Sequence, residues 1–301
     1  TFCSTVNAIL HCGAKPVICD IDPISKNICV DEIEAKINSK TRAIIPVHYA
    51  GFPCEMDMIK DIAERYQLYI VEDCAHAIES RFKGKHCGTF GEVGCFSFYA
   101  TKNIAIGEGG MAISNHPTLI SKIARLGLHG LSRDAWRRFE TAQSKLYDVI
   151  DIGYKLNLTD LQSAIGLVQL DRLMVMRERR LHIWKYYSEA LSEFDIELPS
   201  LPSDSNSTHA MHLFACGLPS STNRDEFVWK ASHEYGITIG VHYNSILTYS
   251  AYKHIWENCD LAENLPVAYD WRNRTISLSL SAAVSDNDCD KIVESVKNLL
   301  K

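Results

Sequence analysis

Short apolar runs alternate with amphipathic stretches over the first part of the chain. The runs at residues 16–20, 42–47 and 68–71 predict strands, because each is brief and ends in polar residues or a turn. The stretches at 30–37 and 56–66 carry apolar residues at helical spacing and predict helices. Such alternation is typical of an α/β fold with a mostly parallel sheet, in which ligands bind beyond the carboxyl ends of the strands.

A further helical pattern begins near residue 160. Thr159 and Gln162 have the spacing of a capping box, and apolar residues recur at helical intervals beyond them. A polar, Ser/Pro-rich stretch at 199–207 precedes more strand-like and helical segments. A chain of 301 residues, 46% of them hydrophobic, can bury two cores. We predict a large domain over residues 1–180 and a smaller α+β domain over 181–301.

The composition argues against two classes of partner. A formal net charge of −6 is not typical of a protein that binds nucleic acid or an anionic membrane. No apolar run approaches the roughly 20 residues that span a bilayer, and the first residues lack a secretory signal pattern. The 11 cysteines show no paired Cys-x-x-Cys framework, which indicates reduced thiols in the cytoplasm rather than a disulfide scaffold.

Two other ligand patterns are disfavoured. Cys74, His76, His86 and Cys87 are residue types that bind zinc, but their spacings do not match paired structural zinc sites, so we expect no metal. The run Gly107-Glu108-Gly109-Gly110 lacks the Lys-Ser/Thr end of a P-loop and the spacing of a dinucleotide fingerprint. It predicts a tight turn instead.

Lys102 is the most informative polar residue, since it follows an aromatic-rich apolar run and precedes this glycine turn. A lysine is normally a solvated surface charge, but burial lowers its pKa and favours the neutral nucleophile. Asp73 follows the strand at 68–71, where it would either cap a helix or pair with a buried cation. A pyridoxal phosphate (PLP) site needs such a pair. The lysine holds the cofactor as a Schiff base, and the carboxylate keeps the pyridine nitrogen protonated, so that the ring is an electron sink.

Four motifs in order resemble the DegT/DnrJ/StrS family of PLP-dependent sugar aminotransferases. They are Glu72-Asp73-Cys74-Ala75-His76 (Glu-Asp-x-Ala-His/Gln in the family), residues 96–103 (Phe-Ser-Phe-x-x-x-Lys-Asn), residues 107–110 (Gly-Glu-Gly-Gly) and the segment 153–170. The likeness is close up to about residue 180 and looser beyond. It implies the PLP-dependent transferase fold type I, similar to aspartate aminotransferase, with Lys102 as the Schiff-base lysine.

The resemblance also implies roles for further residues around the cofactor. Asp73 would contact the pyridine nitrogen, His76 would lie near the ring hydroxyl, Ser97 would bind the phosphate, and Phe2 would stack on the ring. Plain structural roles stay open for three of them: a satisfied histidine, a core serine and a packed aromatic residue.

The resemblance implies a shared active site as well. Lys155 and Asn157 match a family loop that reaches the phosphate of the neighbouring subunit, so a homodimer with shared active sites is expected. Residues 1–8 resemble an internal family segment, and the Gly-Thr-rich turn that usually precedes it and grips the phosphate is absent from the sequence. Either the sequence is N-terminally incomplete or another element supplies those donors.

The substrate side is matched more loosely. His242 and Tyr243 resemble a segment that lines the substrate pocket, and Arg133 would contact a diphosphate unless it belongs to a solvated helix face. Residues 129–136 resemble members that act on carbon 4 of UDP-linked sugars. The resemblance thus implies transfer of an amino group, from glutamate, to a nucleotide-linked keto sugar. A PLP-dependent sugar dehydratase, which carries histidine in place of Lys102, and a non-catalytic sensor or regulatory protein are the alternatives.

Overall fold

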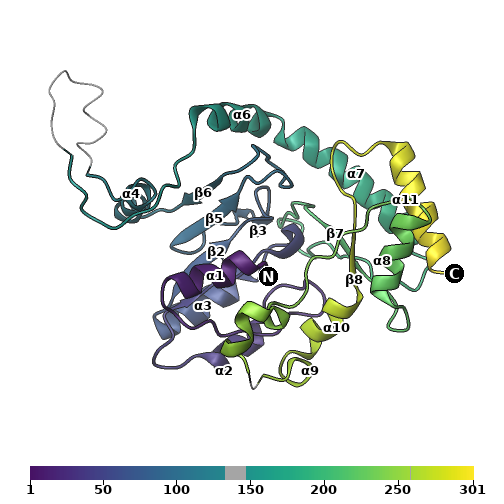
Figure 1. Ribbon diagram of the computed structural model, residues 1–301, viewed down its shortest axis with the longest axis horizontal. Helices are drawn as coiled ribbons and strands as arrows, with labels where there is room; N and C mark the ends of the chain where they lie inside the picture. Colours follow the sequence, from purple (N-terminus) through teal and green to yellow (C-terminus); the bar gives the residue numbers. More distant parts are fainter. Residues whose placement is uncertain (133–146, 258) are drawn as a thin grey trace.

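The computed structural model describes residues 1–132, 147–257 and 259–301 (Figure 1). Its central sheet has the strand order β1–β2–β5–β6, with β1 at Ala43–Ile44, β2 at Tyr69–Asp73, β5 at Val93–Ser97 and β6 at Gly110–Ile113. The first three strands are parallel and β6 is antiparallel to β5. The prediction of an α/β fold with a mostly parallel sheet is confirmed.

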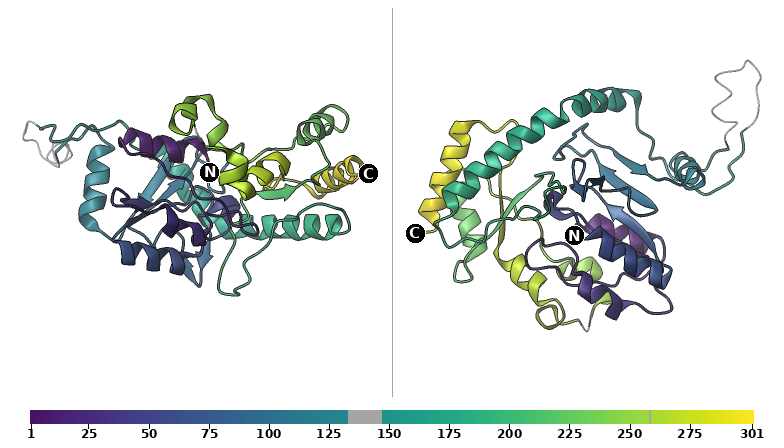
Figure 2. Two further views of the ribbon diagram at one scale, coloured as in Figure 1. Left: turned by 90° about the horizontal axis from the view of Figure 1, so that it is seen from below. Right: turned by 180° about the vertical axis from the view of Figure 1, so that it is seen from behind.

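Helix α3 (Met56–Tyr66) covers one face of this sheet, and its bounds match the predicted helix. Its Ile59 and Ile62 pack with Ile70 of β2, and all three side chains are buried. Helix α1 (Cys3–His11) lies on the other side of the sheet, as the left view of Figure 2 shows. The predicted helix at 30–37 is a 3₁₀ turn followed by a short helix α2 (Ile33–Lys36). Helices therefore lie on both faces of the sheet, and in such folds ligands bind at the ends of the strands.

The remaining elements of the first part are a hairpin, a 3₁₀ turn and one more helix. They are β3 (Arg81–Phe82), β4 (Lys85–His86), the turn Tyr49–Gly51 and α4 (Pro117–Leu126). Helix α6 (Asp160–Asp171) begins with the predicted capping box: the Gln162 N–H donates to Thr159 Oγ1 at 3.3 Å, and the Thr159 N–H donates to Gln162 Oε1 at 3.0 Å. This start signal was correctly predicted from the sequence.

The last part of the chain builds a second core around a two-stranded antiparallel sheet of β7 (Phe214–Gly217) and β8 (Thr275–Leu278). Helices α8 (Arg224–His233) and α11 (Asp286–Leu299) also pack into this core. Between them lie two 3₁₀ turns and two helices that pack elsewhere: Ile246–Thr248, Ser250–Ile255, α9 (Leu261–Asn264) and α10 (Pro266–Arg274). Helix α7 (Leu173–Leu191) leads into this part and contributes Ile183 and Tyr187 to its core. The predicted boundary at residue 180 falls inside α7, and the domain division itself stays a prediction.

The strand predicted at 16–20 is wrong. Asp20 forms other hydrogen bonds than those of a strand. Its carbonyl accepts the Cys29 N–H at 2.9 Å. Its carboxylate accepts the Val267 N–H at 2.9 Å and the Ala268 N–H at 2.8 Å. Those amides are free donors at the start of α10, so Asp20 caps that helix from a distant part of the chain. Among the described residues, no helix is long and apolar enough to cross a membrane.

Candidate active site

Two parallel strands bring polar side chains to one edge of the sheet. Asp73 ends β2 and Ser97 ends β5, and Asp73 is paired in register with Cys95. The Asp73 carboxylate is fixed twice: Oδ2 accepts from the Thr5 hydroxyl at 2.6 Å, and Oδ1 accepts from the Ala75 N–H at 3.0 Å. Helix α1 thus meets the carboxyl end of β2 at the predicted cofactor carboxylate.

Lys102 lies in the turn that follows β5. Its N–H donates to the Tyr99 carbonyl at 2.9 Å, and the Ile106 N–H returns to the Phe98 carbonyl at 3.0 Å, which closes the loop. Gly107 has a φ of +86°, a conformation that favours glycine and lets the chain reverse into β6. The Lys102 side chain is half-buried. Burial lowers the pKa of Lys102, which favours the neutral form of the amine, although the charge of Asp73 opposes the shift.

His76 is buried just beyond β2 and is held as one tautomer. Its Nδ1 accepts the Ala50 N–H at 3.3 Å, so the ring proton resides on Nε2, which lies 3.2 Å from the Tyr243 hydroxyl oxygen. Burial lowers the pKa of His76 well below its usual value, and the nearby His212 and Lys102 lower it further. His76 is therefore a neutral donor beside the lysine.

The loop with the predicted substrate residues reaches this group from the last part of the chain. The Tyr243 ring lies 6.1 Å from His76 and 5.4 Å from Phe2, between centroids, and burial raises the Tyr243 pKa. His242 Nδ1 lies 3.0 Å from the Ser277 hydroxyl, and burial together with Lys102 lowers the His242 pKa. Phe2, at 51% exposure, leaves much of its ring uncovered.

The other predicted residues are placed differently. Ser97 is half-buried and its hydroxyl accepts the Tyr99 N–H at 3.3 Å. Lys155 and Asn157 lie on an exposed loop before α6, where the Asn157 amide contacts the neighbouring Leu158 carbonyl at 3.5 Å. Arg133 lies outside the described residues. The structure therefore brings Asp73, Lys102, His76, Tyr243 and Phe2 into one neighbourhood and places the Lys155–Asn157 loop on the surface.

These side chains fit PLP in their chemistry. A fixed carboxylate at a strand end suits a pyridinium nitrogen, and a half-buried amine suits covalent attachment of an aldehyde. A neutral imidazole N–H suits a ring hydroxyl, and an uncovered aromatic face suits ring stacking. Thr5, Asn103 and His212 also belong to this neighbourhood and were not predicted as site residues. Tertiary contacts bring them there. Asn103 ends the motif at residues 96–103 and Thr5 lies in the matched segment 1–8, whereas His212 carried no sequence signal.

A separate buried group lies behind the strand ends. Ligand atoms of His48, Glu72 and Cys74 lie within 4.8 Å of one another, a spacing compatible with a metal. The Glu72 carboxylate, however, accepts N–H bonds from Gly88 at 2.6 Å and from Phe90 at 2.7 Å, and it contacts His48 Nε2 at 3.2 Å. Those hydrogen bonds occupy the oxygens a metal would need, so Glu72 organises the turn before β5.

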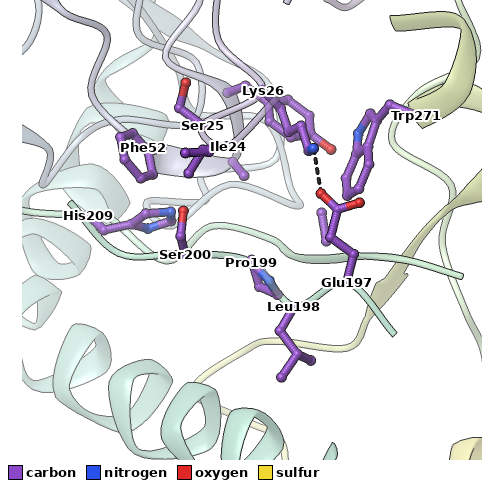
Figure 3. A pocket seen from close by; sticks show the side chains of 13 residues that line it. Ile24, Ser25, Lys26, Phe52, Glu197, Leu198, Pro199, Ser200, His209 and Trp271 are labelled. Atoms are coloured by element: carbon purple, nitrogen blue, oxygen red, sulfur yellow. Dashed lines mark hydrogen bonds and ion pairs between the residues drawn. The ribbon is translucent and has the colours of Figure 1, made fainter. Parts of the chain in front are cut away.

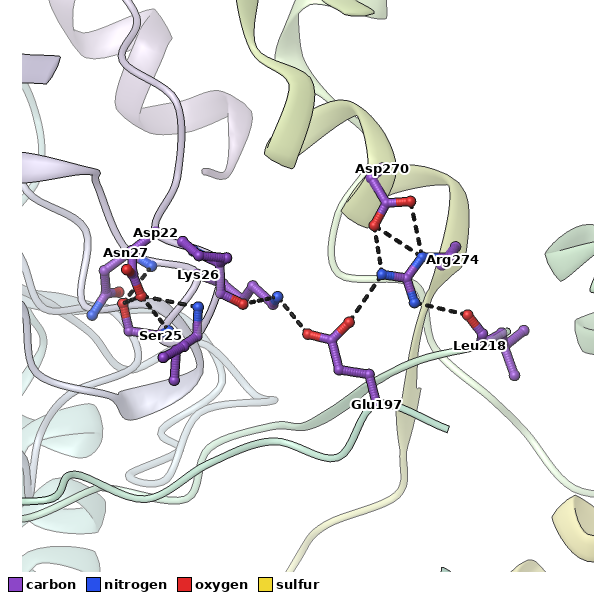
Figure 4. A network of polar contacts seen from close by, with 10 residues as sticks. Asp22, Ser25, Lys26, Asn27, Glu197, Leu218, Asp270 and Arg274 are labelled. Carbon is purple, nitrogen blue, oxygen red and sulfur yellow. Dashed lines mark hydrogen bonds and ion pairs between the residues drawn. The ribbon is translucent and has the colours of Figure 1, made fainter. Parts of the chain in front are cut away.

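A small pocket elsewhere is closed by charges. Lys26 Nζ lies 2.5 Å from Glu197 Oε1 and 4.4 Å from the Trp271 ring centre (Figure 3). Glu197 also receives Arg274 at 2.9 Å, which continues to Asp270 (Figure 4). Because Lys26 is paired with Glu197, this pocket is an unsuitable reactive site. Its ion pairs instead join three segments that are far apart in the sequence, and we call them the Glu197 joint.

This joint also touches the candidate site. Tyr49 lines the pocket, and its hydroxyl donates to the His242 carbonyl at 2.5 Å. Tyr49 thereby supports the segment that carries Tyr243 against His76.

Comparison with known proteins agrees with this geometry. Residues 1–297 match the DegT/DnrJ/EryC1/StrS aminotransferase family. The chain is 40% identical to an uncharacterized protein of Methanocaldococcus jannaschii over 304 aligned positions, covering 100% of this chain and 78% of that protein. It is 37% identical to the spore coat polysaccharide biosynthesis protein SpsC of Bacillus subtilis, with 100% and 77% covered.

A solved structure gives the same result. The putative sugar aminotransferase Spr1654 of Streptococcus pneumoniae, in its PMP form, superposes with a TM-score of 0.90 at 30% identity, covering 99% of this chain and 79% of that one. Its PLP form superposes with a TM-score of 0.89 at 29% identity, with 99% and 78% covered. The chain belongs to the DegT/DnrJ/EryC1/StrS family and is a PLP-dependent sugar aminotransferase of fold type I.

Proposed function

We propose that Lys102 carries PLP covalently and moves the proton in amino transfer, while Asp73 contacts the pyridine nitrogen. The half-buried amine opposed by Asp73 at the sheet edge is the observation that supports this assignment. PLP supplies an electron sink when bound. Asp73, held by Thr5 and Ala75, has the fixed negative charge that keeps the pyridine nitrogen protonated. A neutral Lys102 can take a proton from the substrate carbon and return it.

The neighbouring residues would orient the cofactor. His76, with its proton on Nε2, would donate to the ring hydroxyl in place of the Tyr243 oxygen it faces here. Phe2 would cover one face of the ring, and Ser97 would donate its hydroxyl to the phosphate, since that hydroxyl now only accepts a bond from Tyr99.

We propose a nucleoside diphosphate-linked keto sugar as acceptor, with a UDP-linked 4-keto sugar as the preferred candidate, and glutamate as donor. Glutamate would give up its amino group and leave as 2-oxoglutarate, whose keto oxygen comes from water. The carbonyl oxygen of the sugar would leave as water in the second half-reaction, so no net water is used or released. His242 and Tyr243 reach the lysine's neighbourhood and would contact the sugar. Arg133 would contact the diphosphate. Similarity to the spore coat polysaccharide protein supports a role in polysaccharide biosynthesis.

We further propose a homodimer with shared active sites. The loop with Lys155 and Asn157 is exposed, and the elements next to it carry large apolar side chains on the surface. Leu156 is 73% exposed and Leu161 is 81% exposed. Apolar surface of this extent marks an interface, and a twofold axis would apply the same loop to each partner's site. All 11 cysteines are free thiols in the structure, which supports the proposed cytoplasmic location.

The alternatives are weaker. A sugar dehydratase of this fold would have histidine where this chain has Lys102. A sensor or regulatory protein that does not attach PLP would have no need of a half-buried lysine near a fixed carboxylate.

The decisive experiment is a substrate screen. The purified protein with PLP is incubated with glutamate and UDP-, dTDP- or GDP-linked 4-keto and 3-keto sugars, and the products are identified by mass spectrometry. We expect an amino sugar and 2-oxoglutarate in equal amounts from a UDP-linked 4-keto sugar. Release of water without nitrogen gain would identify a dehydratase, and inert mixtures despite bound PLP would support the sensor.

A further inference from the structure

The Asn103 side chain, directly after Lys102, uses every polar group it has. Its amide nitrogen donates to Glu79 Oε2 at 2.9 Å and to the Ala210 carbonyl at 3.1 Å. Its amide oxygen lies 2.9 Å from His212 Nδ1. The two acceptors decide which end is nitrogen, so the oxygen must face His212, and His212 Nδ1 must carry the proton.

His212 therefore contacts two parts of the candidate site. Its Nδ1–H donates to Asn103, and its ring lies 4.3 Å from the His76 ring, between centroids, with 34° between the planes. Burial lowers the pKa of His212 well below its usual value, and Lys102 adds to the effect, so both imidazoles are neutral. Neutral rings at this distance attract, whereas two imidazolium ions would repel.

The far side of Asn103 is anchored by charge. Glu79 Oε1 pairs with Arg180 Nη2 from α7, and the two residues are only 4% and 3% exposed. Removing one partner of a buried ion pair is strongly destabilising, so Glu79 holds a fixed position. The Asn103 side chain, which donates to Glu79, is consequently fixed too. His212 is held against it by the hydrogen bond from Nδ1 to the amide oxygen.

We propose that His212 is a positioning residue for the amino transfer reaction, because it ties the turn that carries Lys102 to the ring of His76 through Asn103. These two cofactor residues follow different strands, and one side chain from the last part of the chain sets their relative placement. The inference rests on the roles proposed above for Lys102 and His76. His212 itself contacts Asn103 and His76 and would act only through them.

Two substitutions separate the functions of the His212 ring. The His212→Phe variant keeps an aromatic ring against His76 but offers Asn103 no donor. The His212→Asn variant keeps a nitrogen donor near the place of Nδ1 but loses the ring. A matched control is His209→Phe, since His209 is equally buried three positions earlier and its ring packs on Trp184 instead.

The measurement is the attachment of PLP to the protein stripped of cofactor. Growth of the visible absorbance band gives the rate, and borohydride reduction followed by mass spectrometry gives the extent of linkage to Lys102. We expect His212→Phe to slow attachment about tenfold, which corresponds to about 1.4 kcal/mol, the order of one hydrogen bond. His212→Asn should stay within about threefold of the parent, and His209→Phe should match the parent although its melting temperature falls.

Turnover gives a second readout. The His212→Phe variant should lose kcat by about tenfold while KM for glutamate stays within about twofold, since glutamate contacts are untouched. The Asn103→Ser variant cuts the same link from the other side and should slow attachment to a similar degree, which keeps the test valid if His212→Phe does not fold.

Parent-like attachment in both the His212→Phe and Asn103→Ser variants would overturn the positioning role. Equal slowing in the His209→Phe control would do so as well, because it would reduce the effect to general loss of stability. A parent protein with no reducible link to Lys102 would instead refute the proposed function on which this inference rests.

Discussion

The site at the carboxyl ends of β2 and β5 and the segment from residue 150 to 175 differ in burial and in how their polar and apolar side chains are satisfied. At the sheet edge, Asp73, His76 and Asn103 are buried or half-buried, and each has its hydrogen-bonding groups paired. In the later segment, Leu156, Leu161 and many neighbours expose large apolar side chains. The first region is organised by its own chain. The second leaves apolar surface exposed, as the proposed homodimer requires, so catalysis and assembly should fail separately when each region is disturbed.

The largest expected effect comes from Lys102→Ala. Removing the amine takes away both covalent attachment and the proton carrier, so turnover should fall below detection while folding changes little, because the side chain is only half-buried. Enzyme assay and borohydride trapping check this. The surface variant Lys40→Ala is the control and should behave as the parent. A reducible link and full activity in Lys102→Ala would show that the attachment site lies elsewhere.

Asp73→Asn should come next. The amide can still receive the Thr5 hydroxyl bond, but it carries no negative charge to keep the pyridine nitrogen protonated. Losing one charge-assisted contact costs about 1.5–3 kcal/mol, or roughly 10- to 160-fold in kcat. Steady-state kinetics at equal PLP content measure it, with the exposed Asp57→Asn variant as control. A loss below about threefold would show that the carboxylate is structural.

Mixed dimers test the other half of the comparison. Lys102→Ala and Asn157→Ala chains should each be inactive as homodimers if Asn157 serves the partner's site. After subunit exchange, one site of each heterodimer has both residues intact, so activity should recover to about a quarter of the parent's in an equal mixture, by random pairing of chains. Light scattering gives the oligomeric state. Exchange without recovery, or an active monomer, would show that each chain completes its own site.

The two regions also differ in what the sequence revealed. Periodicity predicted α3 and the strand ending at Asp73, and family motifs predicted Lys102 and His76, because local pattern and local motif suffice for both. Thr5 and His212 were missed, since each reaches the site only through tertiary packing. The strand at 16–20 was predicted wrongly because an apolar run does not reveal that Asp20 caps α10.

Acid should destabilise the region around the strand ends, which holds buried neutral histidines, before the exposed segment 150–175. Burial lowers the pKa of His209 to about 3 and holds the pKa values of His76 and His212 well below normal. Below pH ~6.5 the unfolded chain binds protons that the native state does not, so stability falls as the pH drops from ~6.5. Each such histidine contributes up to about 1.4 kcal/mol per pH unit. Urea unfolding at several pH values measures the slope.

The matched variant for this pH test is His209→Gln, which removes one of these titrating groups. Below pH ~6.5 this variant should lower the slope of the unfolding free energy against pH by about 1.4 kcal/mol per pH unit, the value for one proton. Its effect on stability at neutral pH does not change this expectation. An unchanged slope would mean that His209 is protonated in the native state.

The smallest effect is expected at a hydrogen bond that joins the two regions. Thr159 caps α6, and Gln162 of the same capping box donates to the Glu108 carbonyl at 2.7 Å, in the glycine turn after Lys102. Thr159→Ala removes the cap and should cost about 1 kcal/mol of stability.

Ser285→Ala is the matched control, because Ser285 caps α11 with the same kind of capping box, far from the glycine turn in sequence. Both variants should lose similar stability in urea unfolding. If the bond from Gln162 couples the regions, only Thr159→Ala should also raise the amide hydrogen exchange of residues 107–110. Equal exchange in the two variants would show that the surface helix and the site turn respond independently.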